Sequence, residues 1–326
     1  MNRHIVPKLV IVSPCYNEEA ILAYSAERLT SLLQQLVQQA KIAPESYILY
    51  VNDGSRDRTW ELIEELHQRY ADVSGLCLAG NVGHQSAIMA GMLEVVEEAD
   101  AVITIDADLQ DDLAAIETMI DRYGEGYDIV YGVKKTREAD PWLKRTTALT
   151  FYRLQSAMGI RAVYNHADFR LLSQAALRAL ASYPERNLYL RGLIAQLGFP
   201  SAKVDDHISA RVAGSSKYTV RKMLILAIDG ITSFTTRPIS WIIAMGFLSL
   251  LISVAMAVYV LVSYVEHRSV PGWASLMLSL WFIGSMLLFS LGVVGQYIGK
   301  IYMEVKARPR YHIAKQLKHH DRSTEY

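Results

Sequence analysis

The sequence of 326 residues predicts an α/β fold with a mostly parallel central sheet, followed by an interfacial helix and two transmembrane helices. Two observations carry this prediction. In the first half of the chain, short β-branched segments alternate with longer segments whose apolar residues recur at helical spacing. Alternating strands and helices of this length form βαβ units, which build parallel sheets. Beyond Thr236, the composition changes to two long stretches without charged residues.

The elements of the first half follow in order along the chain. We expect strands at Leu9–Ser13, Tyr47–Asn52, Gly75–Ala79, Ala101–Asp106 and Asp128–Val133. We expect helices at Glu19–Gln39, Arg58–Tyr70, Gln85–Glu98 and Leu113–Tyr123. The pattern from residue 134 to residue 215 is less regular, with one late strand over Ala202–Val212. Ligands of parallel sheets bind at the carboxyl ends of the strands, so polar residues at those ends are candidate site residues.

The uncharged stretches are Ile239–Val265 and Val270–Gly299, and each exceeds the ~20 residues that cross a bilayer. Before them, residues 218–236 place apolar side chains on one helical face beside Arg221 and Lys222. This pattern favours an amphipathic helix on the membrane surface, although packing on the soluble core is an alternative. We therefore expect a globular domain over 1–217, an interfacial helix over 218–236, two transmembrane helices within 237–300, and a basic tail over 301–326 that ends in a solvated segment.

Charge placement predicts the orientation of these spans. Basic residues follow the second stretch, at positions 300, 306, 308, 310, 315, 318 and 322, whereas the loop between the stretches holds few charges. By the positive-inside rule, both chain ends and the globular domain are cytoplasmic, and the protein is a multi-pass protein of the inner membrane. The first apolar run, Leu9–Val12, is too short for a signal peptide. The formal net charge of +0 gives no sign of a nucleic-acid partner. Cys15 and Cys77 lie in strand-like segments and predict no disulfide.

The sharpest chemical signal is a pair of carboxylates, Asp106 and Asp108, directly after the strand that contains Ile105. Two carboxylates one residue apart at a strand end repel each other unless a cation lies between them. Mg²⁺ or Mn²⁺ takes oxygen ligands and is often completed by substrate phosphates. The pair therefore predicts a metal and nucleotide-diphosphate site, and an ordinary acidic surface loop is the alternative.

Two further clusters end the first and second strands. Pro14, Tyr16 and Glu18 offer a ring for a base and a carboxylate for a base or ribose, and a plain helix start is the alternative. Asp53 is a second candidate for a base or ribose hydroxyl, whereas Asp57 reads as a helix N-cap outside the site. No strand is followed by Gly-x-Gly-x-x-Gly, which argues against a dinucleotide fold.

Together these motifs resemble the family 2 glycosyltransferases of the GT-A fold. The matching residues are Pro14-x-Tyr16-Asn17-Glu18, Asp53-Gly54-Ser55, Asn81-x-Gly83 and Asp106-x-Asp108-Leu109-Gln110. The second half resembles the polyprenyl-phosphate branch, which includes bactoprenol glucosyltransferases and dolichol-phosphate mannose synthases. Its matching residues are Asp168-Phe169-Arg170-Leu171, Glu185-Arg186-Asn187, Arg191-Gly192, Arg211-x-Ala213-Gly214-x-Ser216-Lys217-Tyr218 and Asp229-Gly230-Ile231.

The resemblance implies roles for these residues. Those that would contact the nucleotide are Pro14, Tyr16, Glu18 and Asp53, and those that would bind metal and diphosphate are Asp106, Asp108 and Gln110. Those that would hold phosphate groups beside the membrane are Arg211 and Lys217, with Arg186 and Arg191 as helpers or as structural ion pairs. Asp168 stands where the family places a catalytic aspartate, and Lys144 and Arg145 are acceptor-side candidates.

This chain departs from the family pattern at two places, and the family's residue roles apply less directly there. The family usually follows Gln110 with Asp-Pro-Pro, whereas this chain has Asp111-Asp112-Leu113, so we expect a different local loop. Residues 134–137 also match loosely, which leaves the basic residues on the acceptor side open.

The expected activity is inverting, metal-dependent transfer of a hexose, with glucose from UDP-glucose as the best guess, to undecaprenyl phosphate. A phosphate monoester with a second pKa of about 6 is already anionic at neutral pH, so it does not strictly need a general base. Asp168 would then orient Arg170 or the acceptor site. A processive polysaccharide synthase and a non-catalytic membrane scaffold are the alternatives, and a homo-oligomer is compatible with the sequence.

Overall fold

A computed structural model describes residues 6–134, 166–186, 189–207, 237–265 and 272–319. These residues divide into two compact units. The first unit, here called the sheet domain, contains the described residues up to 207 together with residues 308–319. The second, here called the helical unit, contains the described residues between 237 and 307.

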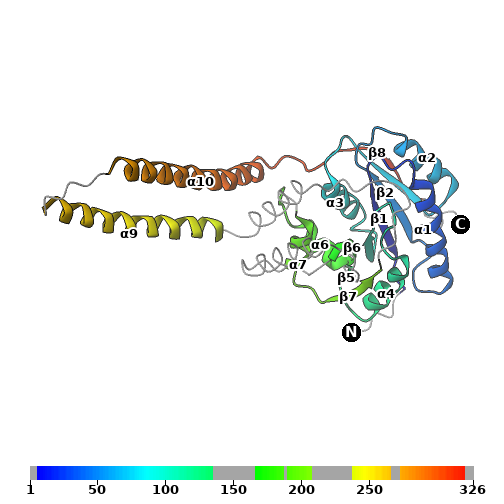
Figure 1. The fold of residues 1–326 in the computed structure, drawn as a ribbon. Coiled ribbons are helices and arrows are strands. Elements are labelled where there is room, and N and C mark those ends of the chain that lie inside the picture. Colours follow the sequence, from blue (N-terminus) through cyan, green and yellow to red (C-terminus); the bar gives the residue numbers. More distant parts are fainter. Residues whose placement is uncertain (1–5, 135–165, 187–188, 208–236, 266–271, 320–326) are drawn as a thin grey trace. The chain divides into compact units, whose positions relative to one another are not determined.

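The sheet domain is built on an eight-stranded sheet with the order β7-β5-β6-β4-β1-β2-β3-β8 (Figure 1). The strands are β1 (Leu9–Cys15), β2 (Tyr47–Asn52), β3 (Val73–Leu78), β4 (Ala101–Thr104), β5 (Ile129–Lys134), β6 (His166–Ser173), β7 (Ser201–Asp206) and β8 (Ile313–Leu317). The four central strands β3, β2, β1 and β4 pair in parallel, and so do β5 and β7. The predicted mostly parallel sheet is therefore confirmed, with β6 and β8 as its antiparallel members.

The register of the strands brings distant residues to one edge of the sheet. Cys15 and Asn52, the last residues of β1 and β2, lie opposite each other. Thr104, the last residue of β4, pairs with Arg170 of the antiparallel β6. Because β6 runs in the opposite direction, its earlier residue Asp168 lies beyond the end of β4. The carboxyl edge of the parallel strands thus also receives the amino-terminal half of β6.

Helices cover both faces of this sheet (Figure 1). They are α1 (Leu22–Gln38), α2 (Thr59–Arg69), α3 (His84–Glu94), α4 (Leu113–Gly124), α6 (Gln174–Ala181) and α7 (Leu190–Gln196). On one face, α1, α2 and α4 share a core with alternate residues of β1, such as Leu9 and Ile11. On the other face, α3 packs closely, since a Cβ added at Gly91 would lie 2.5 Å from the side chain of Val12. This close packing fixes the helix that begins with His84.

The strand β6 was not predicted, because its sequence lacks the expected apolar run. Arg170 lies in the middle of β6 with a fully buried side chain, between the buried residues Phe169 and Leu171. Burial of a guanidinium is tolerated only where an anion is paired with it. Arg170 is paired with Asp168. The polar pattern of this strand is thus explained by an ion pair two residues apart.

The prediction that the last dozen residues form a solvated tail was wrong where they overlap residues 313–317. These residues form β8, which pairs antiparallel with β3 from Gly75 opposite Leu317 to Leu78 opposite Ile313. The side chains of β8 are largely exposed, so the strand carries no apolar alternation that a sequence pattern would reveal. Its pairing rests on backbone hydrogen bonds, supported by bonds such as that from Gln316 to Glu94.

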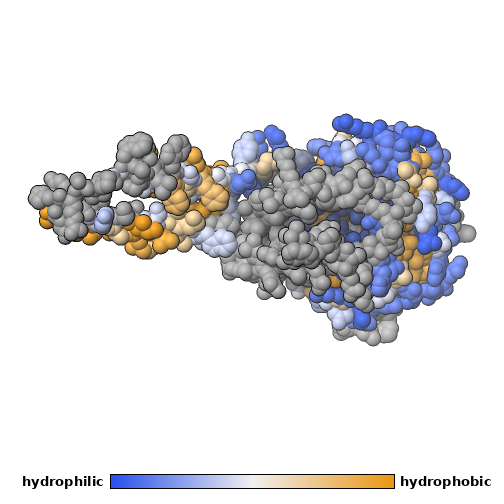
Figure 2. Space-filling view, in the orientation of Figure 1, coloured by the Kyte–Doolittle hydropathy of each residue, from blue (hydrophilic) through white to orange (hydrophobic). Residues whose placement is uncertain are grey.

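The helical unit consists of two long helices, α9 (Arg237–Val265) and α10 (Trp273–Lys306). Their described side chains are mostly apolar and exposed, as the orange surface of both helices shows (Figure 2). Among the described residues, Phe282–Lys306 is long and apolar enough to cross a bilayer, and Ile239–Ser249 is a shorter apolar helical stretch. The predicted interfacial helix over 218–236 lies outside the described residues.

Candidate active site at the carboxyl edge of the sheet

The loops that follow β1 and β2 are hydrogen-bonded to each other; together, residues 16–19 and 53–59 are called here the loop pair. The side chain of Asn17 accepts a bond from the amide of Arg56 (2.9 Å), and its own amide donates to the hydroxyl of Ser55 (3.0 Å). The amide of Glu18 donates to the hydroxyl of Thr59 (2.9 Å). Asn17 has a positive φ of 55°, which asparagine tolerates better than most residues. These bonds hold the two loops in one arrangement.

Of the predicted nucleotide contacts at the end of β1, Tyr16 and Glu18 lie on this loop pair and Pro14 lies in the strand before it. Pro14 is buried in the last part of β1, opposite Val51 of β2. Tyr16 is 40% exposed, so part of an aromatic residue is accessible at the edge of the sheet. Glu18 is partly buried beside it. A nucleotide contact of these residues stays a prediction that their positions permit.

Asp53 has a structural task in addition to the predicted one. Its buried carboxylate accepts bonds from the amides of Val82 (2.7 Å) and Gly83 (3.0 Å), the residues directly before α3. Burial raises the pKa of Asp53, and the two amides oppose that rise. Gly54 has a φ of 60°, and a Cβ there would lie 2.5 Å from the backbone of Gly80. Asp53 therefore anchors the start of α3 to the end of β2.

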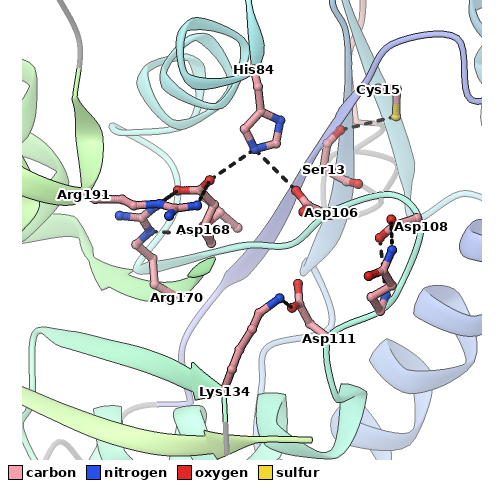
Figure 3. Close-up of polar contacts among 12 residues, drawn as sticks. Ser13, Cys15, His84, Asp106, Asp108, Asp111, Lys134, Asp168, Arg170 and Arg191 are labelled. Atoms are coloured by element: carbon pink, nitrogen blue, oxygen red, sulfur yellow. Dashed lines mark hydrogen bonds and ion pairs between the residues drawn. The ribbon is translucent and has the colours of Figure 1, made fainter. Parts of the chain in front are cut away.

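The residue held by that anchor is His84, which the motif analysis had not singled out. Its Nε2 lies 3.5 Å from Oδ1 of Asp106 and 3.4 Å from Oδ2 of Asp168 (Figure 3). Burial opposes protonation of His84, but the bond to Asp168 and the charge of Asp106 outweigh it and raise the pKa of the imidazole. Its place at a helix start beyond the carboxyl end of β3, next to Asn81-x-Gly83, was the signal available in the sequence.

Asp168 lies among three cationic groups, and these residues together with Asp106 are called here the charge cluster (His84, Asp106, Asp168, Arg170 and Arg191). Arg191 of α7 donates two parallel bonds to the carboxylate of Asp168, at 3.2 Å from Nε and 3.1 Å from Nη2. Arg170 donates a third, and His84 completes the set. Burial favours the neutral acid, but the bond from His84 and the charges of Arg191 and Arg170 hold the pKa of Asp168 well below its usual range.

Of the two predicted metal-binding aspartates, Asp106 has charged side chains of both signs around it. Burial and the negative charges of Asp168 and Asp108 raise its pKa, whereas His84 and Lys134 oppose the rise. Its side chain is nevertheless 49% exposed, so an incoming cation can reach it. A carboxylate held among other carboxylates is stabilised by such a cation.

Asp108 and Gln110 are presented by a tight turn. Between them, Leu109 is buried in the core cluster although its φ is 47°, a value uncommon for residues with a side chain. The amide group of Gln110 donates to the carboxylate of Asp108. The predicted metal ligands Asp106, Asp108 and Gln110 therefore share one loop, although the described residues hold no group of three or more His, Cys, Asp or Glu residues placed to bind a metal.

The same loop is tied to two strands on its other side. Asp111 is buried and lies 3.5 Å from Nζ of Lys134 on β5, and Asp206 of β7 accepts a bond from the amide of Asp112 (2.9 Å). Asp112 is the N-cap of α4, and its carboxylate accepts a bond from the amide of Ala114. Where the family pattern has prolines at the helix start, this chain uses an aspartate cap.

Only some of the remaining predicted site residues lie within the described parts of the chain. Arg191 belongs to the charge cluster, and Arg186 lies in the segment between α6 and α7. The predicted phosphate-binding and acceptor-side residues Arg211, Lys217, Lys144 and Arg145 lie outside the described residues. Cys15 is a buried free thiol, and Cys77 is a partly buried one.

The chain is similar to several known proteins over much of its length. The family described as Glycosyl transferase family 2 matches residues 10–181, which span β1 to α6. The glycosyltransferase YkoT of Bacillus subtilis is 46% identical over 307 residues, covering 94% of this chain and 91% of the relative. The SfII prophage-derived bactoprenol glucosyl transferase of Shigella flexneri is 35% identical over 311 residues, covering 94% of this chain and 98% of the relative. A solved structure of glucosyl-3-phosphoglycerate synthase from Mycobacterium tuberculosis superposes with a TM-score of 0.49 at 16% identity, covering 69% of this chain and 78% of that one.

Proposed function

The chain belongs to glycosyl transferase family 2, and we propose that it transfers glucose from UDP-glucose to undecaprenyl phosphate at the cytoplasmic face of the inner membrane. Similarity to a bactoprenol glucosyl transferase extends over nearly the whole of both chains. It therefore includes the helical unit as well as the sheet domain. This extent supports a polyprenyl phosphate, rather than a soluble sugar, as the acceptor.

The observation that carries the proposal is the state of Asp168. A general base must be able to take up a proton near the working pH. Asp168 is held as a carboxylate by His84, Arg170 and Arg191, which makes it a weak base at neutral pH. An acceptor hydroxyl would need a base, whereas a phosphate oxygen already carries the negative charge for attack. A site with a firmly ionised aspartate therefore suits a phosphate acceptor.

The reaction we propose is a single displacement with inversion. An oxygen of the acceptor phosphate attacks the anomeric carbon, and the bond from that carbon to the nucleoside diphosphate breaks. Arg191 and Arg170 keep Asp168 in place, so that this carboxylate orients the acceptor side of the site. Catalysis then rests on positioning two anions and on balancing their charge.

The residues of the turn after β4 fit a divalent metal. Asp106 and Asp108 offer hard oxygen ligands, and the repulsion that raises the pKa of Asp106 is relieved by a cation. Two protein carboxylates with the remaining positions left to diphosphate oxygens are typical of Mg²⁺ sites. A bound Mg²⁺ or Mn²⁺ would supply positive charge to the departing diphosphate. Gln110 sits on the same turn and would complete the contacts.

The nucleotide would lie along the loop pair. The exposed ring of Tyr16 would stack on the base, and Glu18 and Asp53 would accept bonds from base or ribose. On the membrane side, Arg186, Arg211 and Lys217 would bind phosphate groups. Anchoring the site through α9 and α10 avoids extracting a prenyl chain from lipid, at about 0.8 kcal/mol for each exposed CH₂. The exposed apolar side chains of both helices support this membrane role.

The test is transfer of radiolabelled sugar from a panel of UDP- and GDP-sugars into extractable undecaprenyl phosphate, with Mg²⁺, Mn²⁺ or EDTA. The full-length protein is compared with Asp108→Ala and with Glu97→Ala, which removes an exposed carboxylate that pairs with Arg178 at the surface. We expect labelling from UDP-glucose that needs the metal, is lost in Asp108→Ala and is kept in Glu97→Ala.

Two outcomes would contradict parts of the proposal. No labelling from any donor, with folded protein and lipid present, would exclude carrier loading and favour the scaffold. Labelling from another donor would overturn only the choice of glucose and would leave the proposed reaction in place. The anomeric configuration of the lipid-linked product, read by NMR, tests inversion independently of both.

A further inference from the structure

The segment that follows α10 contacts the part of the sheet domain that carries Arg191. We propose that Arg310 is a positioning residue for the acceptor side of the active site, acting through the connection between α6 and α7. This inference rests on the proposed function for its kinetic consequence, and on contacts within the sheet domain for its structural one.

The residues that follow Arg310 are held along the edge of the sheet by hydrogen bonds and a ring contact. The amide of Ala79 donates to the carbonyl of His312 (2.8 Å), and β8 then pairs with β3 up to Leu317. The side chain of Gln316 donates to Glu94 at the end of α3 (2.6 Å). The ring of His319 stacks on that of Tyr47 with centroids 4.5 Å apart. These contacts hold residues 312–319 along the edge of the sheet.

Arg310 lies just before these held residues and bonds to the segment after α6. Its Nε donates to the carbonyl of Glu185 (2.9 Å), and its Nη2 donates to the carbonyl of Tyr183. Both carbonyls belong to the segment after α6, and the guanidinium is partly buried there. A planar guanidinium can bond two carbonyls in one fixed geometry, which a lysine ammonium cannot reproduce. Arg310 thus ties residues 183–185 to the strand that follows α10.

The helix α7, which follows residues 183–185 in the chain, carries Arg191 of the charge cluster. The helix α7 begins at Leu190, whose amide donates to the side chain of Gln85 (2.9 Å), the neighbour of His84 on α3. The next residue, Arg191, makes the two parallel bonds to Asp168. The helix is therefore held at its first turn by α3, and Arg310 holds the chain shortly before it. Loosening that connection should loosen Arg191 on Asp168.

The expected consequence is a selective change. The bonds that hold the loop pair and the bonds that Arg310 donates to residues 183 and 185 join different parts of the sheet domain, so nucleotide binding should be kept. Orientation on the acceptor side should suffer, and small displacements of positioning groups lower catalytic rates by large factors. A lower kcat with unchanged nucleotide affinity is the signature of a residue that acts on the reacting geometry.

The experiment compares full-length Arg310→Ala and Arg310→Lys with Lys315→Ala, all in detergent or lipid. Lys315 lies five residues further along the chain, on β8, and its ammonium contacts Glu64 at the surface (3.5 Å), so it serves as the matched control. Hydrogen exchange of peptides covering 183–196 is measured first, because it does not depend on any activity. We expect exchange in Arg310→Ala to be roughly tenfold faster, with Lys315→Ala unchanged.

Kinetics follow with undecaprenyl phosphate and the donor found in the panel, and UDP affinity is measured by calorimetry with Mn²⁺. We expect kcat to fall roughly tenfold in Arg310→Ala, to be partly restored in Arg310→Lys, and UDP affinity to stay within about twofold. The inference is overturned if Arg310→Ala matches Lys315→Ala in exchange and in kcat, or if UDP affinity falls as far as kcat does. Absence of transfer in the unmodified protein would count against the proposed function, while the exchange comparison would still decide the role of Arg310.

Discussion

The two halves of the candidate site are held together by different forces. In the loop pair, nearly every contact is a hydrogen bond between a side chain and a backbone amide, such as Asn17 with Arg56 or Asp57 with Glu19. In the charge cluster, the contacts join full opposite charges, such as Asp168 with Arg170 and Arg191. A frame of backbone bonds keeps its shape whatever ligand arrives. A charge cluster changes its balance whenever a ligand adds or removes charge.

The comparison suggests which half does which work. A loop pair fixed by bonds to backbone amides suits recognition of a constant group, namely the base and ribose of the donor. A charge cluster suits the part of the reaction in which a diphosphate and a phosphate meet and charge moves between them. Substitutions in the two halves should therefore fail in different ways, and the following predictions test that difference.

The largest effect is expected at Asp108, on the turn that leads from β4 to α4. Replacing Asp108 by Asn keeps the size of the side chain and removes its charge, so the metal and diphosphate lose a ligand. We expect initial transfer rates to fall about a thousandfold, as for the loss of a group that stabilises transition-state charge. The melting temperature should stay close to that of the unmodified protein. A loss of less than about tenfold would separate Asp108 from the reaction.

The second prediction concerns Asp168, the centre of the charge cluster. Asp168→Asn leaves the fully buried guanidinium of Arg170 without its anion. Breaking a buried ion pair from one side destabilises by about 3–5 kcal/mol, so we expect a marked fall in the denaturant midpoint together with loss of transfer.

Two matched variants sharpen this prediction. Replacing both partners, as Asp168→Asn with Arg170→Met, should recover much of the stability without recovering transfer. His84→Gln removes a weaker, half-exposed partner and should lower the rate of transfer about tenfold with little change in stability. Equal stability loss in the single and double variants would show that the pair is not the reason for the loss.

In the loop pair, the largest effect should come from Asp53, and it should appear first as stability. Asp53→Asn can accept only one of the two bonds from Val82 and Gly83, and its amide group faces the other donor. A buried donor left without an acceptor costs about 1–3 kcal/mol. Thermal unfolding should show this loss, and transfer measured well below the melting temperature should fall less than in Asp108→Asn. A thousandfold rate loss without destabilisation would instead assign Asp53 to the chemistry.

The smallest effect should come from Asp57, and it depends on pH. Burial raises the pKa of Asp57, but bonds from Thr59 and Glu19 outweigh burial and lower the pKa overall. A carboxylate with a lowered pKa in the folded state stabilises the protein above its unfolded pKa of about 3.9. That contribution is lost as the pH falls through the folded value. Asp57→Asn should therefore be less stable by about 1 kcal/mol at pH 7.

The measurement is the difference in unfolding free energy between Asp57→Asn and the unmodified protein at pH 7, 5, 4 and 3. The difference should be constant from pH 7 to pH 5 and should shrink below about pH 4. A difference that is independent of pH down to the lowest value would show that the bonds of Asp57, and not its charge, stabilise the loop pair.

The sequence predicted those parts of the fold that carry a strong periodic pattern. The strands that lead to Asp53 and Asp106 are short, apolar and followed by polar clusters, so their carboxyl ends and the candidate residues there could be placed. The strand β6 could not, because Arg170 interrupts its apolar pattern and only the fold shows the partner that makes this possible. β8 could not either, since five largely exposed residues carry no alternation.

The site was predictable as far as its residues follow a strand or a motif. Asp106, Asp108 and Asp168 were identified in this way. His84, which contacts both Asp106 and Asp168, was not. His84 lies far from these two aspartates in the sequence. Its position depends on the close packing of α3 on Val12 and on the hydrogen bond from the amide of Gly83 to Asp53. Such a contact arises from tertiary packing, which no local pattern contains.

The pairing of β8 with β3 has a consequence for how the chain is made. Gln316 meets Glu94 across 222 positions of sequence, and the two long helices lie between them. During synthesis, β3 has an unpaired edge until the ribosome has released residues 313–317, and unpaired strand edges are templates for aggregation. Pairing over such a distance is slow, because a large loop must close first. Production of the sheet domain alone, without its last strand, is therefore expected to yield insoluble protein, and co-expression of the missing strand is the natural remedy.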